Sequence, residues 1–235
     1  MKIRGHRECR DCGHRWSYYE TGEVACPDCG SMLSRGVDDR TRHTDSAATL
    51  DLGRHRSTFG EVPVEEFADD LKGTLREYRR RRGFVSGGRL LELDDTYLAA
   101  AELRHTIDVY ARRRDPTTDE ELYVLDLLRS ADAGERPGPD DVPASMTAAR
   151  GLGDAESVDD YRKDAVVYLD DNPDPEARRL FGQLREQVKR VEALQGDVSP
   201  GEAESLVAAA RDLWRGISEG DETALATAAD RLAGR

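Results

Sequence analysis

The sequence lacks any long apolar run, and this absence excludes one class of protein at the outset. None of its 235 residues fall in a stretch that approaches the roughly 18 apolar residues of a membrane span. Residues 1–30 also lack the apolar stretch of a signal peptide. We therefore expect a protein without membrane contact, located in the cytoplasm.

Lysine and isoleucine are scarce, and acidic residues are in excess. Only four of the 35 basic residues are Lys, only three residues are Ile, and Asp outnumbers Glu. This composition resembles that of proteins from salt-loving archaea. The net charge is −13, yet residues 1–45 hold eight basic and eight acidic residues, so all of the excess acid lies after them. Because molar salt shortens the screening length to about 3 Å, this acidity does not exclude contact with nucleic acid.

The sequence also lacks the common signatures of catalysis. Gly87 and Gly88 lie in a predicted turn without the further glycines, or the lysine, of a phosphate-binding loop. No Gly-x-Ser-x-Gly elbow is found. We therefore expect a binding protein rather than an enzyme. An active site within the helical region is the weaker alternative.

Cysteine is confined to the N-terminal segment, where its spacing carries the clearest chemical signal. Two Cys-x-x-Cys-Gly motifs, at Cys9 and Cys12 and at Cys26 and Cys29, are separated by a short aromatic stretch. The glycine after each pair permits the positive φ of a tight turn. Four thiolates placed in this way select Zn²⁺ or iron over hard cations. We predict one structural zinc ion, with iron as the less favoured metal. Without an export signal, disulfides are disfavoured.

Residues 7–32 resemble a known zinc module. The Cys-x-x-Cys-Gly motif, an aromatic strand and Cys-Pro-x-Cys-Gly resemble the zinc ribbon of archaeal transcription factor B. The whole chain resembles a haloarchaeal family of unknown function in which such a ribbon precedes a helical region. The first resemblance implies a protein partner, such as the transcription machinery.

A second resemblance, to the rubredoxin-like module of rubrerythrins, implies iron and a helical bundle with a di-iron site. Glu102 and His105 have the Glu-x-x-His spacing of such a site. A di-iron centre needs a second Glu-x-x-His motif, and the other histidines all precede the helices. The sequence therefore argues against a di-iron peroxidase, and we expect His105 to be a core or surface residue.

The remaining sequence shows helical periodicity almost to its end. We predict a mainly α protein, in which a small N-terminal β zinc ribbon (residues 1–45) is followed by a connector (46–61) and an irregular all-α helical bundle (62–235). Apolar residues spaced three and four apart between Val64 and Tyr78 form a stripe on the first predicted long helix. Asp94 or Asp95 caps the second predicted helix, and Thr118 with Glu121 forms a capping box for the third. Further helices are predicted over residues 157–170, 174–195, 200–218 and 221–233.

Basic and aromatic side chains near the cysteines are candidates for contact with nucleic acid or a protein partner. The candidates, together with the neighbouring Arg4, are Arg7, Arg10, Arg15, Trp16 and Tyr18. The alternative is that the aromatic rings pack over the metal-binding turns. Two arginine runs, residues 79–82 and 112–114, lie where helices are predicted to end, so we expect them to complement helix dipoles.

These patterns together predict a zinc-ribbon binding protein with a transcription-associated or regulatory role through protein or nucleic-acid contact. The alternative function is a helical scaffold whose zinc site is purely structural and unrelated to transcription.

Overall fold

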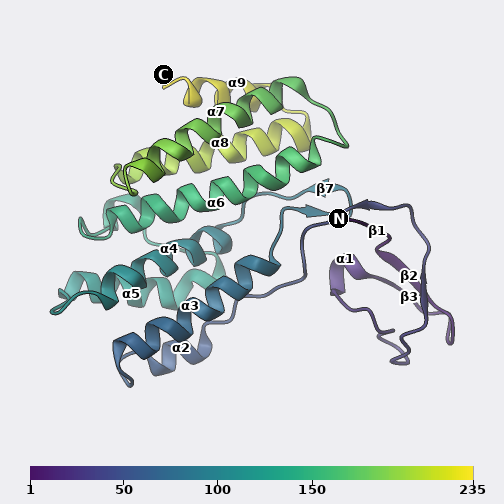
Figure 1. Cartoon of the computed structure of the whole chain (residues 1–235), viewed down its shortest axis with the longest axis horizontal. Coiled ribbons are helices and arrows are strands. Elements are labelled where there is room, and N and C mark those ends of the chain that lie inside the picture. Colours follow the sequence, from purple (N-terminus) through teal and green to yellow (C-terminus); the bar gives the residue numbers. More distant parts are fainter. Residues whose placement is uncertain (235) are drawn as a thin grey trace.

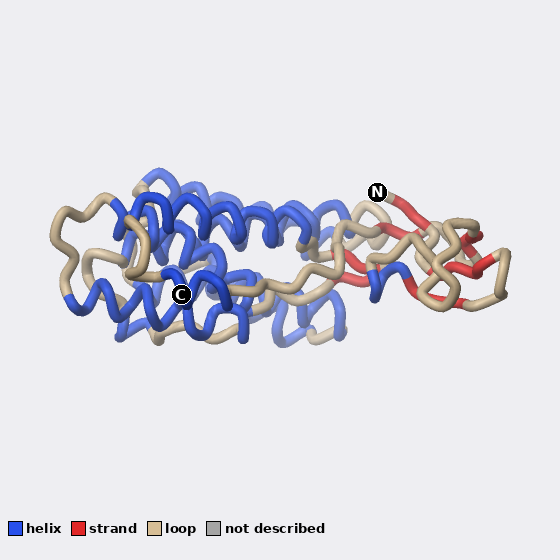
Figure 2. The backbone as a smooth tube through the Cα atoms, turned by 90° about the horizontal axis from the view of Figure 1, so that it is seen from below, coloured by secondary structure: helices blue, strands red, loops and turns tan. Residues whose placement is uncertain are grey.

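The computed structural model describes residues 1–234. The chain forms a helical part and a smaller part that contains most of the strands (Figure 1). The long helices lie at one end of an elongated molecule, and most of the strands lie at the other end with the short helix α1 (Figure 2). We call residues 1–45 the strand module. The predicted mainly α fold with a small N-terminal β region is confirmed.

The strands are short and the longer elements are all helices. The strands are β1 (Lys2–Ile3), β2 (His6–Cys9), β3 (Arg15–Ser17), β4 (Ser34–Gly36), β5 (Thr41–Arg42), β6 (Val85–Ser86) and β7 (Arg89–Leu90). The helices are α1 (Tyr18–Thr21), α2 (Gly53–Thr58), α3 (Val64–Arg81), α4 (Asp95–Ala111), α5 (Thr118–Ser130), α6 (Thr147–Tyr168), α7 (Pro175–Ala193), α8 (Pro200–Glu219) and α9 (Glu222–Leu232), with 3-10 turns η1 (Ala131–Ala133) and η2 (Pro139–Asp141). No helix within residues 1–234 is both long enough and apolar enough to span a membrane.

The strand module consists of two small antiparallel sheets. One has the order β3-β2-β4, and Arg7 at its centre lies opposite Trp16 and Gly36. The other pairs β1 with β5, so that Lys2 lies opposite Arg42. Strand β2 therefore connects the first cysteine pair to both neighbouring strands.

Helix α6 lies at the centre of the helical part and packs against α4, α7 and α8. Close approach to α4 depends on Gly153, because a Cβ atom there would lie 2.8 Å from the backbone of Glu102. One apolar core extends across all the long helices and includes Leu50 and Leu52 from the predicted connector, which also contains α2. Residues 46–61 are thus packed against the helices along part of their length.

Helix boundaries agree with the sequence patterns except at two places. Asp94 caps α4 by accepting a hydrogen bond from the Tyr97 N–H at 2.8 Å, as predicted. The capping box of α5 is formed by Thr117 and Glu120, so the predicted pair was one residue too late. The helix predicted from residue 157 begins at Thr147. Its first turns carry buried charged residues in place of an apolar stripe, and periodicity therefore missed them.

The first arginine run lies in the last turn of α3 and just after it, as predicted, and two of its members also make contacts with other parts of the helical bundle. Arg79 is buried, lies 4.9 Å above the Tyr97 ring, and pairs with Glu156 at 2.9 Å and Asp160 at 2.8 Å on α6. The following Arg82 pairs with Asp94 at 2.9 Å. These two arginines are therefore committed to contacts within the protein.

The strand module is joined to the helical part by ion pairs and backbone contacts. Lys2 and Arg42 both pair with Asp171, just after α6, at 2.7 and 3.0 Å. The Gly88 N–H in the β6–β7 turn donates to the Arg42 carbonyl oxygen at 2.8 Å. The sheet that contains β1 and β5 is thereby fixed against the end of the bundle (Figure 1).

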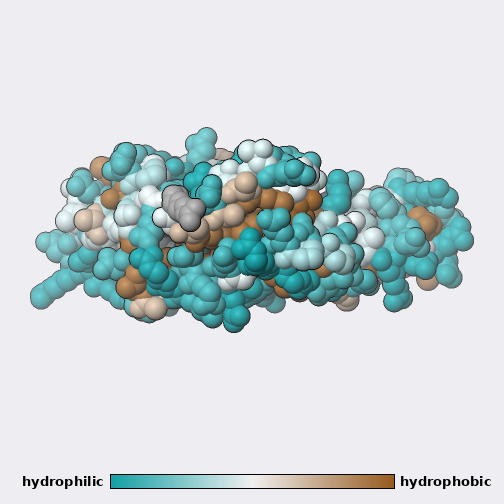
Figure 3. All heavy atoms as spheres, turned by 90° about the horizontal axis from the view of Figure 1, so that it is seen from above, coloured by the Kyte–Doolittle hydropathy of each residue, from teal (hydrophilic) through white to brown (hydrophobic). Residues whose placement is uncertain are grey.

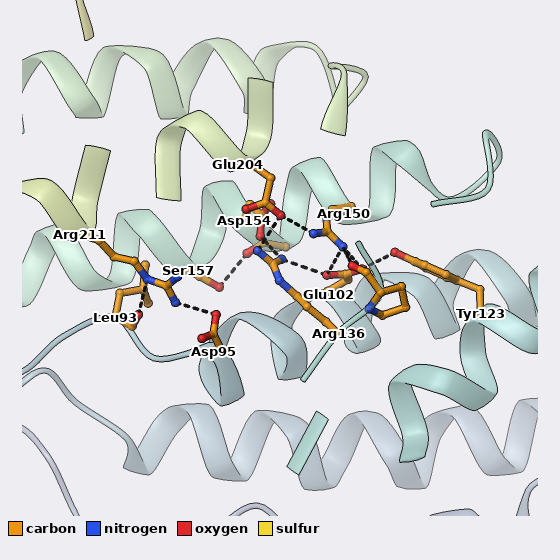
Figure 4. A network of polar contacts seen from close by, with 12 residues as sticks. Leu93, Asp95, Glu102, Tyr123, Arg136, Arg150, Asp154, Ser157, Glu204 and Arg211 are labelled. Atoms are coloured by element: carbon orange, nitrogen blue, oxygen red, sulfur yellow. Dashed lines mark hydrogen bonds and ion pairs between the residues drawn. The ribbon is translucent and has the colours of Figure 1, made fainter. Parts of the chain in front are cut away.

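A buried network of charges connects four helices and a loop (Figure 4). Arg136 lies in the loop between η1 and η2 and pairs with Asp154 on α6 at 2.6 Å, Glu102 on α4 at 3.0 Å and Glu204 on α8 at 3.0 Å. Arg150 on α6 contacts the same two glutamates. The Tyr123 hydroxyl on α5 also donates to Glu102. The full set is Glu102, Tyr123, Arg136, Arg150, Asp154 and Glu204.

The network holds three carboxyl groups against two guanidinium groups, and Asp154 is the least well compensated. Its Oδ2 atom is buried and has no hydrogen-bond partner among the described residues. Burial raises the pKa of Asp154 from 3.8 to about 6, although Arg136 acts in the opposite direction. The folded protein therefore holds this proton more tightly than the unfolded chain does.

This raised pKa predicts a pH-dependent stability. The contribution of Asp154 is fully present below about pH 4 and is lost as the pH rises through about 6. In Asp154→Asn the charge cannot form, so the stability of the natural protein relative to this variant should fall by up to about 3 kcal/mol between pH 4 and pH 8. Denaturant unfolding followed by helical circular dichroism measures the difference.

Asp230→Asn is the matched control, because Asp230 on α9 is exposed and has no ion pair with any described residue. Its stability relative to the natural protein should stay nearly constant over the same pH range. A constant difference for Asp154→Asn as well would show that Asp154 is ionised throughout.

Candidate metal centre

The four cysteines lie on two turns with the same backbone pattern. In the first turn the Cys9 N–H donates to the His14 carbonyl oxygen, and in the second the Cys26 N–H donates to that of Ser31, each at 2.8 Å. The residue after each second cysteine is a glycine with positive φ, 78° at Gly13 and 72° at Gly30. Residues with a side chain rarely adopt this backbone conformation, which explains why both motifs require glycine there.

The two turns bring four sulfur atoms into one cluster. All four Sγ atoms lie within 4.8 Å of one another. The Cys9–Cys29 and Cys12–Cys26 sulfur pairs are each 3.6 Å apart. A tetrahedral zinc ion with Zn–S bonds of about 2.3 Å would require sulfur separations of about 3.8 Å. The donor set therefore fits a four-coordinate metal ion with small adjustments.

The environment of these thiols opposes the joint ionisation of the four sulfurs. The backbone N–H of Cys12, aided by that of Asp11, lowers the pKa of Cys9 to about 7. The backbone N–H of His14 also lowers the pKa of Cys12, but desolvation and the neighbouring sulfurs outweigh it and raise this pKa to about 12. Four thiolates at these separations are stable only around a positive charge.

Apolar burial gives the strand module little support of its own. Its buried apolar cluster consists of Cys9, Cys26 and Trp16, which is separate from the core of the helical part. The Trp16 indole N–H donates to the Glu23 carbonyl oxygen at 2.9 Å. A segment with so small a core depends on other bonds for its stability. The four cysteines could supply them by holding a metal ion, which would lack an open coordination position for catalysis.

Some of the predicted contact residues are bound to other groups of the protein, and others are accessible. Trp16 is buried against the cysteines, as the packing alternative predicted. Arg15 is exposed but pairs with Glu8 at 2.6 Å, and Arg35 on β4 pairs with the same carboxylate at 2.6 Å. Arg10 is exposed on the first cysteine turn. Arg10 and the neighbouring Arg4 are thus exposed and have no ion pair with any described residue.

Arg7 and Tyr18 line a cavity of about 320 Å³ beside the junction with the helical part. Arg4 and His43 line it as well. Sequence reasoning had no signal for His43, which reaches this place because β5 pairs with β1. The Tyr18 and His43 rings meet edge to face with their centroids 6.0 Å apart.

Glu102 and His105 do not share a site, in agreement with the sequence argument against a di-iron centre. Glu102 belongs to the buried network, whereas the His105 Nε2 atom lies 3.0 Å from Glu156. Within residues 1–234, the four cysteines form the one group whose ligand atoms are close enough together to hold a metal ion.

Comparison with known proteins gives one match over the whole chain and one partial match. The model of a family described as a family of unknown function (DUF7117) matches residues 1–232. The DNA polymerase II large subunit of Halobacterium salinarum is 27 % identical to this chain over 195 residues. The aligned region covers 75 % of this chain but only 14 % of that subunit. No solved structure matches.

Replacing one cysteine tests whether the cluster organises the strand module. Cys26→Ser should lose the metal and unfold residues 1–45, because thiolate–metal bonds take the place of a core there. Most of the helical circular dichroism should remain, since the core of the helical part contains none of these residues. Elemental analysis together with circular dichroism measures both effects, and we expect one zinc ion per natural chain.

Asp28→Ala is the control, because Asp28 is exposed between two of the cysteines and leaves all four sulfurs in place. It should retain the metal. Native protein without bound metal, or a red iron–thiolate colour, would contradict the zinc assignment. Loss of the helical signal in Cys26→Ser would show that the two parts fold together.

Proposed function

We propose that this chain, which belongs to the family of unknown function DUF7117, is a metal-stabilised binding protein whose strand module contacts single-stranded nucleic acid. The four cysteines would hold zinc in a ribbon that presents basic side chains to the ligand. The role is binding rather than catalysis, in a process such as transcription or its regulation.

The distribution of unpaired positive charge carries this proposal. Half of the basic residues of the strand module pair with carboxylates, namely Lys2, Arg15, Arg35 and Arg42. The other half have no ion pair with any described residue, namely Arg4, Arg7, Arg10 and Arg40. The strand module carries no net charge, whereas the rest of the chain carries the whole net charge of −13, so these four guanidinium groups make the module the part of the chain best suited to contact phosphates.

The partial match supports a role connected with nucleic acid but not a specific activity. The name of the matched Halobacterium salinarum protein places that protein in DNA synthesis. Because the alignment covers only a small share of that subunit, polymerase activity is not part of the proposal. A binding module that accompanies nucleic-acid enzymes is consistent with the match and with the unpaired arginines.

Titration of a labelled 20-nucleotide oligodeoxythymidylate with zinc-loaded full-length protein tests this function. We expect binding whose logarithmic affinity falls with the logarithm of salt concentration with a slope of about −2, corresponding to about three phosphate contacts on a single strand. Fluorescence anisotropy between 50 mM and 1 M salt measures the slope.

Arg185→Ala provides a control in the helical part, because Arg185 is exposed on α7 and has no described ion pair. It should bind like the natural protein, and Cys26→Ser should lose binding. Absence of binding at 50 mM salt would contradict the proposal, as would full binding by Cys26→Ser.

Exposed apolar side chains favour a second candidate function, the docking of a protein partner. Seven large apolar residues are exposed in the described chain, and four of them lie in one short stretch of the strand module, namely Val24, Met32, Leu33 and Val37. An apolar spot is visible within the otherwise hydrophilic surface at that end of the molecule (Figure 3). Such clustering is typical of interaction surfaces.

The resemblance to the ribbon of transcription factor B makes RNA polymerase the partner to test. Tagged natural protein purified from cells in high salt should recover polymerase subunits, and the double variant Met32→Ser/Leu33→Ser should recover at least tenfold less. Leu194→Ser, which replaces an exposed apolar residue in the helical part, should have no effect. Equal recovery by all three proteins would exclude this surface.

A further inference from the structure

The cavity beside the junction combines two arginines with two aromatic residues. Its lining includes Ile3 of β1, and β1 lies where the strand module meets the helical part (Figure 1). Its volume of about 320 Å³ is at the lower end of the range for small-molecule pockets. The lining includes Arg4, Arg7, Tyr18, His43 and Asp45. Two arginines and two aromatic residues thus line one small space.

The positive charge of this cavity is available to a ligand. Neither Arg4 nor Arg7 pairs with a carboxylate of any described residue, and Arg7 is held by hydrogen bonds to the Ser34 hydroxyl at 2.7 and 2.9 Å. The one acidic lining residue, Asp45, is neutralised by Arg82 at 2.7 Å. By contrast, the cavity between α5 and η2 is lined by four aspartates and no basic residue.

Of the two aromatic rings in the lining, Tyr18 is the accessible one, whereas His43 is buried and also packs against Tyr19 with the ring centroids 5.0 Å apart. Trp16 is buried against the cysteines, and the Tyr19 hydroxyl is bound to the Thr41 side chain at 2.7 Å. The Tyr18 ring is only half-buried and touches the edge of His43. The His43 Nδ1 atom accepts a hydrogen bond from the Gly87 N–H at 3.4 Å, so its Nε2–H is left as a donor.

From this arrangement we infer that the cavity binds one nucleotide unit of a single strand, with its base against Tyr18 and His43 and its phosphate on Arg4 and Arg7. Stacking on an aromatic ring accepts any base, and guanidinium groups bind phosphate through paired N–H donors. The inference rests on the proposed function and assigns its contact to one site. Arg10 and Arg40 lie outside this site and serve only to attract the strand.

Substitutions in the cavity test this assignment in the zinc-loaded full-length protein. With the labelled oligodeoxythymidylate, Tyr18→Leu should weaken binding about fivefold or more, because it removes the stacking surface and keeps an apolar side chain. Arg4→Gln should reduce the magnitude of the salt slope by about 0.7, the value of one lost phosphate contact. Metal content and circular dichroism should be unchanged in both variants.

Arg40→Gln is the matched control, since Arg40 is exposed in the same module, has no described ion pair and does not line the cavity. Arg40→Gln should leave the stacking of a base on Tyr18 unchanged, and it should weaken binding of the oligonucleotide less than Arg4→Gln does. If the natural protein binds the strand and Tyr18→Leu binds equally well, the cavity assignment is wrong while the proposed function stands.

Calorimetric titration with adenosine 5′-monophosphate tests nucleotide binding by the cavity independently of oligonucleotide binding. Binding that Tyr18→Leu weakens would support the cavity as a nucleotide site, even if the oligonucleotide did not bind and the proposed function failed. Failure of both probes to bind the natural protein would overturn the assignment.

Discussion

The strand module depends on one constraint, the convergence of four cysteine sulfurs within 4.8 Å. Thiolates that close repel one another, so they need a shared cation, and the segment around them has only Trp16 as a large buried side chain. Two features of the module are tied directly to this cluster: strand β2 ends at Cys9, and the buried Trp16 indole packs against the cysteines.

The helical part is stabilised in a different way, which suits a very acidic chain. Its apolar core is continuous, but at its centre Arg136 and Arg150 bind carboxylates from α4, α6 and α8. A buried ion network is costly to desolvate and requires all of its partners at once. It therefore fixes the mutual positions of the helices, and with them the end of α6 on which the strand module rests.

The arginines of this molecule fall into two groups, those that form ion pairs within the protein and those that do not. Arg79 and Arg82 belong to a dense basic run in the sequence, yet both form ion pairs with other parts of the helical bundle. Arg4 and Arg7 are less conspicuous, yet they retain unpaired guanidinium groups beside Tyr18. Local density of arginine is therefore a poor guide to binding here, because burial and ion pairing decide which charges a partner can reach.

The sequence by itself determined the features that depend on local chemistry. Cysteine spacing identified the four ligand candidates, and apolar periodicity and capping residues placed most helices within a few residues. Only the tertiary structure decided the rest. In the first turns of α6, Arg150 finds partners on α4 and α8 and Asp154 finds Arg136 in a distant loop, and no local period reveals such partners. Likewise, His43 reaches Tyr18 only through strand pairing, because contacts between residues far apart in the chain follow from the fold as a whole.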